Sequence, residues 1–216
     1  MKKLFTLIFA TAFLSASAQT WTYYTSADGL IEGITSSLIQ DTDGNFWFGD
    51  WTANNSPGIG KFDGSDFSSY GTADGAPSNA ITSVFQDSSD NYWFATSDDQ
   101  GVSKFDGTTW TNYTTADGLV SDFIWEIDQD SQGNMWFIGD GLSKFDGTTW
   151  TNYATINGQN IYANSMIESS NGDFWFTTAL GLGLVKFDGT TWTNFTTSDG
   201  FSSDTPGAIF QDSNDN

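Results

Sequence analysis

The stretch DSQGNMWFIGDGLSKFDGTTWTNY, residues 130–153, holds together the markers that decide the fold of this chain. An Asp-x-x-Gly-Asn turn precedes Met135-Trp136-Phe137, which is followed by Lys144-Phe145-Asp146-Gly147 and then by Trp150-x-x-Tyr153. The same markers recur along the chain in the same order. Such self-similarity indicates an internal repeat, and a repeat determines the whole architecture.

The copies are spaced by about forty residues, the length of one propeller-type repeat. Lys-Phe-Asp-Gly begins at Lys61, Lys104, Lys144 and Lys186, so successive starts are 43, 40 and 42 residues apart. The Trp-bearing triplet lies at 46–48, 92–94, 135–137 and 174–176. The Trp-x-x-aromatic pair lies at 21–24, 110–113, 150–153 and 192–195, with Phe67 and Tyr70 as a weaker copy.

Each unit is predicted to form four short strands. In the second copy these are 81–86, 92–96, 101–105 and 108–114, and β-forming residues dominate all of them. The Asp-Gly pair between the last two strands predicts a type I′ hairpin turn. The Trp-bearing strand is apolar on both faces, as expected for a strand that is covered on both sides. Four strands per repeat of this length are typical of a β-propeller blade.

We therefore predict an all-β chain, a β-propeller of four-stranded antiparallel blades with about four full blades plus partial ones, forming an incomplete ring. The predicted blades are 31–70, 78–114, 120–154 and 160–196, with a partial blade at 203–216, all within a repeat region of 19–216. The pair at 21–24 predicts a lone outer strand at 21–25. The last repeat stops within its predicted first hairpin, so we expect the chain to be part of a longer protein with further domains.

Residues 1–18 are predicted to be a cleaved signal peptide. Lys2 and Lys3 precede an apolar run at 4–14, and Ala16-Ser17-Ala18 is a small-x-small cleavage site. The apolar run is too short for a membrane span, which needs roughly 20 residues. We therefore expect a secreted, periplasmic or cell-surface protein with no membrane insertion.

Charge narrows the range of partners. The chain carries 27 acidic and 6 basic residues, a net charge of −21, and this disfavours nucleic acid and anionic lipid surfaces. It has no His, Cys or Arg, so it supplies neither a Ser-His or Cys-His nucleophile nor a His or Cys metal site. An aromatic fraction of 17% argues against disorder despite the charge.

The full motif resembles the two-component-regulator propeller repeat. The resemblance rests on Asp117-Gly118-Leu119, the run 130–139 and Gly141-Leu142-Ser143-Lys144-Phe145-Asp146-Gly147, and it extends over 21–216. It implies the periplasmic ligand-sensing part of a bacterial hybrid histidine kinase, or a related secreted protein, often in glycan-responsive systems. The streptogramin-type lyases share the Gly-Asn-x-Trp-Phe core, but that family is expected to use a catalytic His that this chain lacks.

Two chemical alternatives remain open. A glycoside hydrolase or polysaccharide lyase needs only Asp and Glu, and Glu32, Glu126 and Glu168 are predicted to lie near inner strands. The turn at 41–45, Asp-Thr-Asp-Gly-Asn, invites a calcium interpretation. Turn chemistry explains it better, because the closing Glu of a calcium loop is missing and later copies keep only part of the pattern. We predict no cofactor beyond weak, non-specific calcium binding.

The candidate ligand site rests on positions that break the repeat. The loop 50–57 is longer than its counterparts and carries an extra Trp, while Trp125 and Glu126 stand where other copies have small polar residues. Inner strands line the channel of a propeller, and the loops after second strands open on the same rim. The candidates on this rim are Trp51, Asn54, Asn55, Asp98, Asp99, Gln100, Trp125, Glu126, Asn160 and Tyr162.

Aromatic faces beside amides and carboxylates suit sugars, and loops on rigid scaffolds are where binding tends to occur. The sequence therefore favours a non-catalytic extracytoplasmic binding or sensing propeller whose ligand is a glycan or an extracellular protein. The alternatives are a polysaccharide-cleaving propeller enzyme and a structural or adhesive repeat array of a surface protein.

Overall fold

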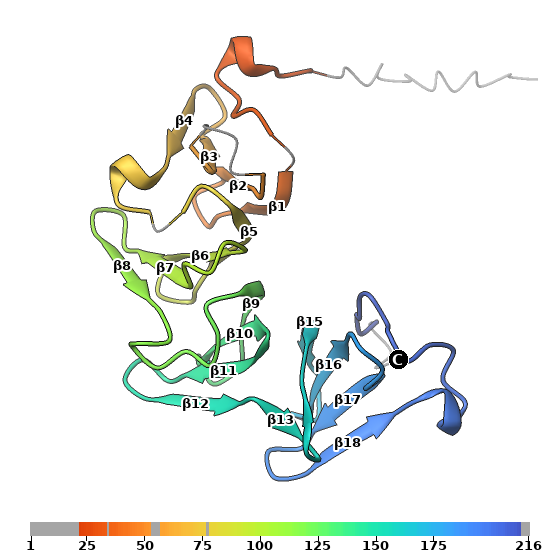
Figure 1. The fold of residues 1–216 in the computed structure, drawn as a ribbon. Coiled ribbons are helices and arrows are strands. Elements are labelled where there is room, and N and C mark those ends of the chain that lie inside the picture. The colour runs from red at the N-terminus through yellow and green to blue at the C-terminus, as the bar shows by residue number, and fades with distance from the viewer. Residues whose placement is uncertain (1–21, 34, 53–56, 77, 213–216) are drawn as a thin grey trace, which may run out of the picture.

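The computed structural model describes residues 22–33, 35–52, 57–76 and 78–212, and the predicted signal peptide lies outside them. Four antiparallel sheets of four strands each follow one another around an arc (Figure 1). Blade one contains β1 (Thr35–Gln40), β2 (Phe46–Asp50), β3 (Ile59–Phe62) and β4 (Phe67–Tyr70). Blade two contains β5 (Ile81–Gln86), β6 (Tyr92–Thr96), β7 (Val102–Phe105) and β8 (Trp110–Tyr113).

Blade three contains β9 (Ile124–Gln129), β10 (Met135–Gly139), β11 (Gly141–Phe145) and β12 (Trp150–Tyr153). Blade four contains β15 (Ala163–Glu168), β16 (Phe174–Thr178), β17 (Leu184–Phe187) and β18 (Trp192–Phe195). A small hairpin of β13 (Thr155–Ile156) and β14 (Gln159–Asn160) connects blades three and four. The described residues also form three short 3₁₀ turns: η1 (Ser26–Asp28) precedes blade one, η2 (Thr72–Asp74) lies between blades one and two, and η3 (Thr197–Asp199) follows blade four.

The first strand of every blade is the inner one. β1, β5, β9 and β15 contact one another in sequence, while β4, β8, β12 and β18 lie at the periphery (Figure 1). The predicted propeller architecture of four-stranded blades is thus confirmed. The inner strands of all four blades border the concave side of the arc (Figure 1). A side chain that departs from the regular alternation of an inner strand can therefore face this shared space.

A buried carboxylate fixes the Trp of blades one to three. In blade one, Asp41 accepts hydrogen bonds from the backbone N–H of Asn45 at 2.7 Å, from Trp47 Nε1 at 2.9 Å and from Tyr92 Oη of the next blade at 2.8 Å. Burial raises the pKa of Asp41, but these donors outweigh it and lower the pKa to about 2. The turn carboxylate is therefore an ionised structural acceptor, as the turn interpretation of 41–45 requires.

The Lys of each Lys-Phe-Asp-Gly motif covers the same Trp from the neighbouring strand. Lys61 pairs across the sheet with Trp47, and its ammonium lies 5.1 Å from the ring centroid. The corresponding Lys–Trp distances in blades two to four are 5.5, 5.4 and 5.7 Å. A cation over an indole face is attracted by its quadrupole, which explains why the motif begins with Lys.

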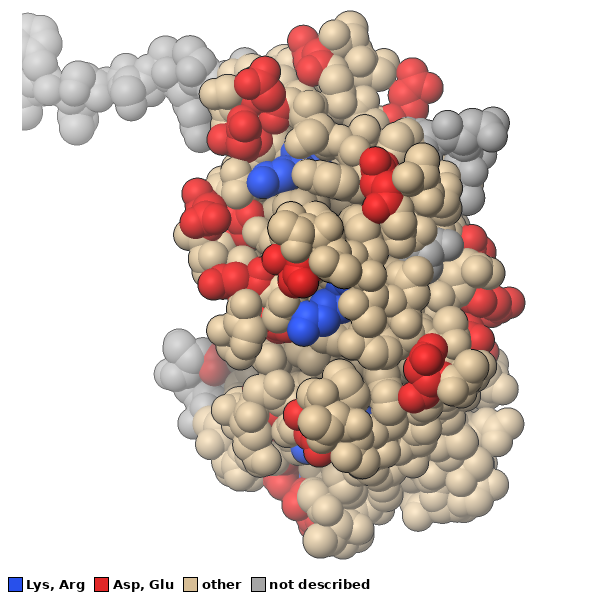
Figure 2. Space-filling view, turned by 90° about the vertical axis from the view of Figure 1, so that its left-hand side faces the viewer, with Lys and Arg blue, Asp and Glu red and all other residues tan. Residues whose placement is uncertain are grey.

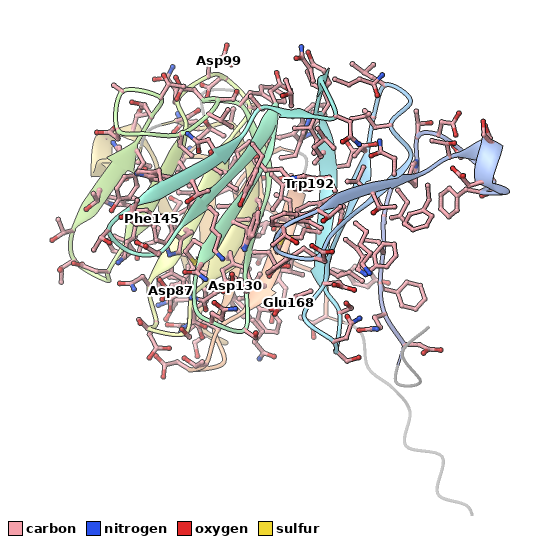
Figure 3. The ribbon with its side chains drawn as sticks, turned by 90° about the horizontal axis from the view of Figure 1, so that it is seen from below. Asp87, Asp99, Asp130, Phe145, Glu168 and Trp192 are labelled. Atoms are coloured by element: carbon pink, nitrogen blue, oxygen red, sulfur yellow. The ribbon has the colours of Figure 1, made fainter. Side chains whose placement is uncertain are left out.

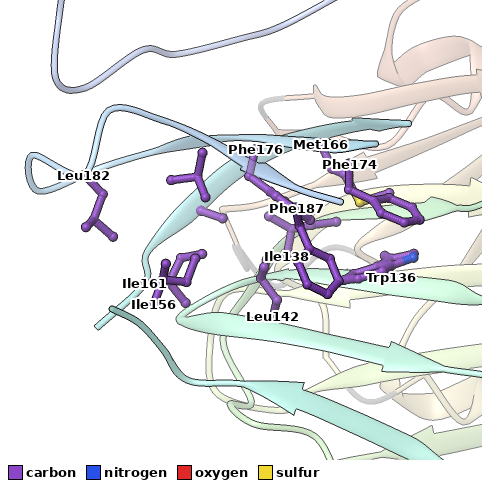
Figure 4. Packing of buried hydrophobic residues seen from close by; sticks show 12 residues of the cluster. Trp136, Ile138, Leu142, Ile156, Ile161, Met166, Phe174, Phe176, Leu182 and Phe187 are labelled. Carbon is purple, nitrogen blue, oxygen red and sulfur yellow. The ribbon is translucent and has the colours of Figure 1, made fainter. Parts of the chain in front are cut away.

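The hydrophobic core lies between blades, in three clusters that repeat one arrangement. In the cluster between blades three and four, Trp136 of β10 packs against Phe174 and Phe176, at 4.9 and 5.8 Å between ring centroids (Figure 4). Trp47 and Trp93 meet Phe94 and Phe137 of their next blades in the same way. Each Trp therefore joins two sheets.

The prediction of a type I′ turn at Asp-Gly is wrong. A type I′ turn needs positive φ at both central residues, but at Asp106-Gly107 the Gly has a φ of +95° while Asp106 does not enter that region. The Asp106 carboxylate instead accepts the N–H groups of Thr108 and Thr109, at 2.9 and 2.8 Å. Side-chain capping thus stabilises a longer loop.

The predicted outer strand at 21–25 is also not formed. Trp21 lies outside the described residues, and 22–25 has no regular structure. Tyr24 nevertheless packs on Phe62 and Phe67, at 5.0 and 5.3 Å between ring centroids. Tyr70 makes the equivalent contacts with blade two, so Tyr24 takes the position of a preceding blade's last Tyr without strand pairing.

Replacing Asp130 with Ala tests the role of the buried carboxylate. Asp130 accepts Trp136 Nε1 at 3.1 Å and pairs with Lys144 at 3.2 Å, and its side chain is fully buried. Removing it leaves buried donors and a cation unpaired, so we expect a loss of about 3 kcal/mol in the free energy of unfolding by urea. Asp146→Ala, in an exposed turn, serves as the control and should cost less than about 1 kcal/mol. Equal losses in the two variants would contradict this role.

Candidate functional site

Every inner strand contains a β-bulge at the same place. The register of each inner strand against its neighbour skips one residue, between its first and third positions. The skipped residues are Ser36, Thr82, Trp125 and Asn164. A bulged residue is released from strand alternation, so a bulge can re-aim its side chain.

The four bulge residues surround a hollow on the concave side of the arc. Together with Trp51 they line a cavity of about 490 Å³. Trp51 and Trp125 are 45% and 41% exposed, so each presents a large part of its indole to solvent. The other three lining residues carry a hydroxyl or an amide. The lining therefore combines two aromatic surfaces with uncharged hydrogen-bonding groups.

Contacts between blades fix the polar lining. The hydroxyl of Ser36 donates to the carbonyl of Ile81 at 2.5 Å, and that of Thr82 donates to the carbonyl of Ile124 at 2.6 Å. Because both hydroxyl protons are engaged, these oxygens can only accept hydrogen bonds from a ligand. An amide such as that of Asn164 can both donate and accept.

Local contacts flank both Trp residues of the first hollow. Trp51 directly follows β2, where Asp50 Oδ1 accepts the N–H and hydroxyl of Thr52 at 2.8 and 2.7 Å. Trp125 rests on Phe123, with ring centroids 4.9 Å apart and planes at 86°. The ring contact limits the orientations of the Trp125 indole, and the Asp50–Thr52 bonds fix the chain on either side of Trp51.

A second hollow of about 400 Å³ adjoins the first and shares Trp125 and Asn164 with it. Its further lining residues are Phe123, Asp140, Tyr162, Ala179 and Leu180. Two of the lining residues, Asp140 and Tyr162, are paired by an isolated antiparallel β-bridge. Burial raises the pKa of Asp140, and the charge of Asp99 raises it further.

The structure brings only some of the ten sequence candidates together. Trp51 and Trp125 line the first hollow, and Tyr162 lines the second. Asp98, Asp99, Gln100 and Asn160 are exposed and line neither, and Asn54 and Asn55 lie outside the described residues. Asp99 lies at one end of the sheets, while Asp87, Asp130 and Glu168 lie toward the opposite end (Figure 3).

The bonds of Asp98 and Gln100 are local. Asp98 accepts the hydroxyl of Ser78 at 2.6 Å, and Gln100 donates to the Asp98 carbonyl at 3.2 Å. Asn160 pairs with Thr155 in the connecting hairpin. None of these three residues lines either hollow.

Glu126 was expected on the concave side, but its side chain does not face it. Its carboxylate lies between blades three and four and accepts the backbone N–H of Met166 at 3.1 Å. Burial raises its pKa to about 7, against the lowering effect of hydrogen bonds from Ser165 and Met166, and Asp128 adds a smaller raising effect. Its neighbour Trp125 occupies the bulge, so Glu126 turns toward the next blade.

Sequence reasoning missed Ser36, Thr82 and Asn164 as lining residues. They occupy the same repeat position as Trp125, which was the signal that could have identified them. A site on a repeat protein is often built from one position taken from every repeat. In this chain the aromatic residue breaks the repeat and so points to the position, whereas its small polar counterparts match one another and give no signal of their own.

The described residues show neither a metal-binding cluster nor a membrane-spanning helix. Among them, no group of three or more His, Cys, Asp or Glu side chains is arranged to hold a metal ion. In the same residues, no helix combines the length and apolar character that a membrane crossing requires.

Known structures share this fold. The extracellular domain described as that of the hybrid two-component system BT3049 of B. thetaiotaomicron is 20% identical, with a TM-score of 0.70 over 86% of this chain and 26% of its own. The BT4673 extracellular domain of the same organism is 18% identical, with a TM-score of 0.68 over 88% and 28%. Virginiamycin B lyase of Staphylococcus aureus is 16% identical, with a TM-score of 0.67 over 84% and 61%.

The chain thus spans about a quarter of the length of the sensor domains that it matches. No curated protein matches it by sequence. A family model for the two-component regulator propeller matches residues 75–98, which include β5, the following turn and β6. The markers that this segment carries recur in all four blades, so the other blades are similar to the matched repeat.

Proposed function

We propose that this protein is a non-catalytic extracytoplasmic binding or sensing propeller that holds a glycan in the hollow on its concave side. One observation carries the proposal: Trp51 and Trp125, from distant parts of the sequence, lie at one cavity together with the uncharged groups of Ser36, Thr82 and Asn164. Binding sites commonly combine apolar or aromatic walls with a few polar groups that fix orientation.

The chemistry of the lining matches that of a sugar. Pyranose rings expose C–H faces that stack on indoles, and their hydroxyls can donate to the Ser36 and Thr82 oxygens. None of the five lining residues is charged. The ligand that fits best is therefore a neutral oligosaccharide.

Electrostatics points away from acidic ligands. The net charge is −21, Asp140 lines the adjoining second hollow, and Asp99 lies close enough to Asp140 for its charge to raise the pKa of that carboxyl. Acidic side chains are scattered over the outer face, and basic ones occur singly there (Figure 2). This field repels polyanions, including acidic polysaccharides and nucleic acids.

The similarity to extracellular sensor domains supports the sensing role and a location outside the cytoplasm. The predicted signal peptide at 1–18 agrees with that location. A form of the similar lyase described as catalytically inactive carries an Ala in place of a His, and these 216 residues contain no His. The lining of the first hollow also includes no carboxylate, so that cavity gives no support to the alternative of Asp/Glu catalysis.

A binding screen with Trp variants tests the proposal. The secreted protein is titrated with neutral and acidic oligosaccharides by calorimetry, and the products are analysed by chromatography. We expect saturable binding of a neutral oligosaccharide without turnover, weakened at least about tenfold by Trp51→Ala and by Trp125→Ala. Tyr23→Ala, at an 85% exposed position away from both hollows, is the matched aromatic control and should bind normally.

Other outcomes decide between the alternatives. Product formation would establish an enzyme. Binding of an extracellular protein that both Trp variants abolish would replace the glycan by a protein ligand. Absence of any saccharide or protein binding in the wild type would contradict the proposal and favour a structural array.

A further inference from the structure

The inner strands of neighbouring blades are joined by one recurring hydrogen bond. The third residue of an inner strand accepts the backbone N–H of the fourth residue of the next inner strand. Ser37 accepts Val84 N–H at 3.1 Å, Ser83 accepts Ile127 N–H at 3.2 Å and Glu126 accepts Met166 N–H at 3.1 Å. The junction between blades three and four thus uses a carboxyl group where the other two use a hydroxyl.

This junction also lacks the bond that the bulge residue makes at the other two junctions. At the bulge position, Ser36 and Thr82 donate their hydroxyls to the next inner strand. The corresponding residue of blade three is Trp125, which has no hydroxyl and lines the hollow. Glu126 therefore carries more of the connection between β9 and β15 than its serine counterparts do elsewhere.

The surroundings of Glu126 disfavour its charge. The side chain is partly buried, and its neighbour on the same side of β9 is the carboxylate Asp128. Across the junction, β15 offers Ser165 and the Met166 N–H, with Glu168 further along. Its partner on β10 is the apolar Ile138, and β5 carries no charged residue. Burial is the main reason why the pKa of Glu126 rises to about 7.

The junction and the hollow share the same two strands. Glu126 and Ser165 at the junction are adjacent in sequence to Trp125 and Asn164, which line both hollows. A change in the separation of β9 and β15 must therefore move the indole of Trp125 relative to the amide of Asn164. The bond from Met166 to Glu126 spans that separation.

We propose that Glu126 is a positioning residue whose ionisation loosens the junction between blades three and four and thereby weakens ligand binding in the adjoining hollow. The neutral acid fits the partly buried junction and accepts the Met166 N–H. The carboxylate is repelled by Asp128 and draws water between the strands, because a charge is poorly accommodated at low dielectric. The effect on binding rests on the proposed function, whereas the effect on the junction does not.

Nuclear magnetic resonance of the ligand-free protein tests the junction. The Met166 amide and the Trp125 indole N–H should shift between pH 5.5 and 8.5 with a common midpoint near 7, set by the raised pKa of Glu126. The amides of Val84 and Ile127 donate in the same geometry to Ser37 and Ser83, so they are internal controls that should not follow this titration. In Glu126→Gln, a neutral isostere, and Glu126→Ser, the residue of the other blades, the shared titration should vanish.

Urea denaturation gives a second ligand-free measurement. A carboxyl whose pKa is higher in the folded than in the unfolded protein favours folding while it is protonated. For Glu126 this contribution is fully present below the unfolded-state pKa of about 4.5, and it is lost as the pH rises through the folded-state pKa of about 7. Relative to Glu126→Gln, the wild type should therefore have a lower urea midpoint at pH 8 than at pH 5. An equal difference at both pH values would show that Glu126 does not titrate at the junction and would overturn the proposal.

Binding of the oligosaccharide found in the screen completes the test. Wild-type affinity should fall at least about fivefold from pH 6 to pH 8.5, whereas Glu126→Gln should keep the high-affinity value throughout. An equal fall in the variant, or a Trp125 indole that ignores the Glu126 titration, would overturn the link to the hollow. If no saccharide binds, the proposed function fails, while the resonance and urea measurements still decide the junction.

Discussion

The structure depends on a buried hydrogen bond between a turn carboxylate and the indole N–H of the Trp that follows it by six residues. In blades one to three, Asp41, Asp87 and Asp130 each hold such an indole at 2.8–3.1 Å, together with backbone N–H groups of the turn. A buried carboxylate is tolerated only when its lone pairs are occupied, so the turn, the indole and the neighbouring strands must adopt one arrangement. The orientation of the Trp then sets how the next blade packs, and Lys from the third strand lies over the ring and helps to bury it. Blade four shows the limits of this rule: Ser169 replaces the carboxylate, Lys186 pairs instead with Asp173 at 2.6 Å, and Trp175 is not fully buried.

This uniform packing leaves two kinds of position free to vary: the bulge residue of each inner strand and the loop after each second strand. The four bulge residues and Trp51 lie outside the Trp clusters between blades, so substitutions at these positions leave those clusters intact. The chain uses both, with Trp125 at a bulge and Trp51 at the start of the longest such loop. Function in a superfold is carried by residues grafted onto such permissive positions, and the hollow is composed of them.

The repeat made the fold predictable, because three markers at one period leave one way to stack the sheets. The site was only partly predictable. The alternation of side chains along a strand does not predict the orientation of residues next to a bulge, because the extra residue interrupts that alternation. Trp125 and Glu126 were both expected on the concave side, but only Trp125 lies there. The expected type I′ turn failed for a local reason: the Asp106 carboxylate caps two backbone N–H groups and stabilises a turn that needs only one residue with positive φ.

The same geometry explains why the two departures of blade three occur side by side. A bulge makes consecutive residues serve different surfaces, one facing the hollow and the next facing the neighbouring blade. In blades one and two the pair is Ser-Ser or Thr-Ser, and both hydroxyls bind the following blade. Replacing the first hydroxyl with an indole gives an aromatic surface to the hollow but removes one bond between blades. A longer acceptor at the second position can reach across a wider junction, and Glu126 does so. The indole and the carboxyl therefore form one structural adaptation, in which the residue that meets the ligand and the residue that joins the blades are adjacent in the chain.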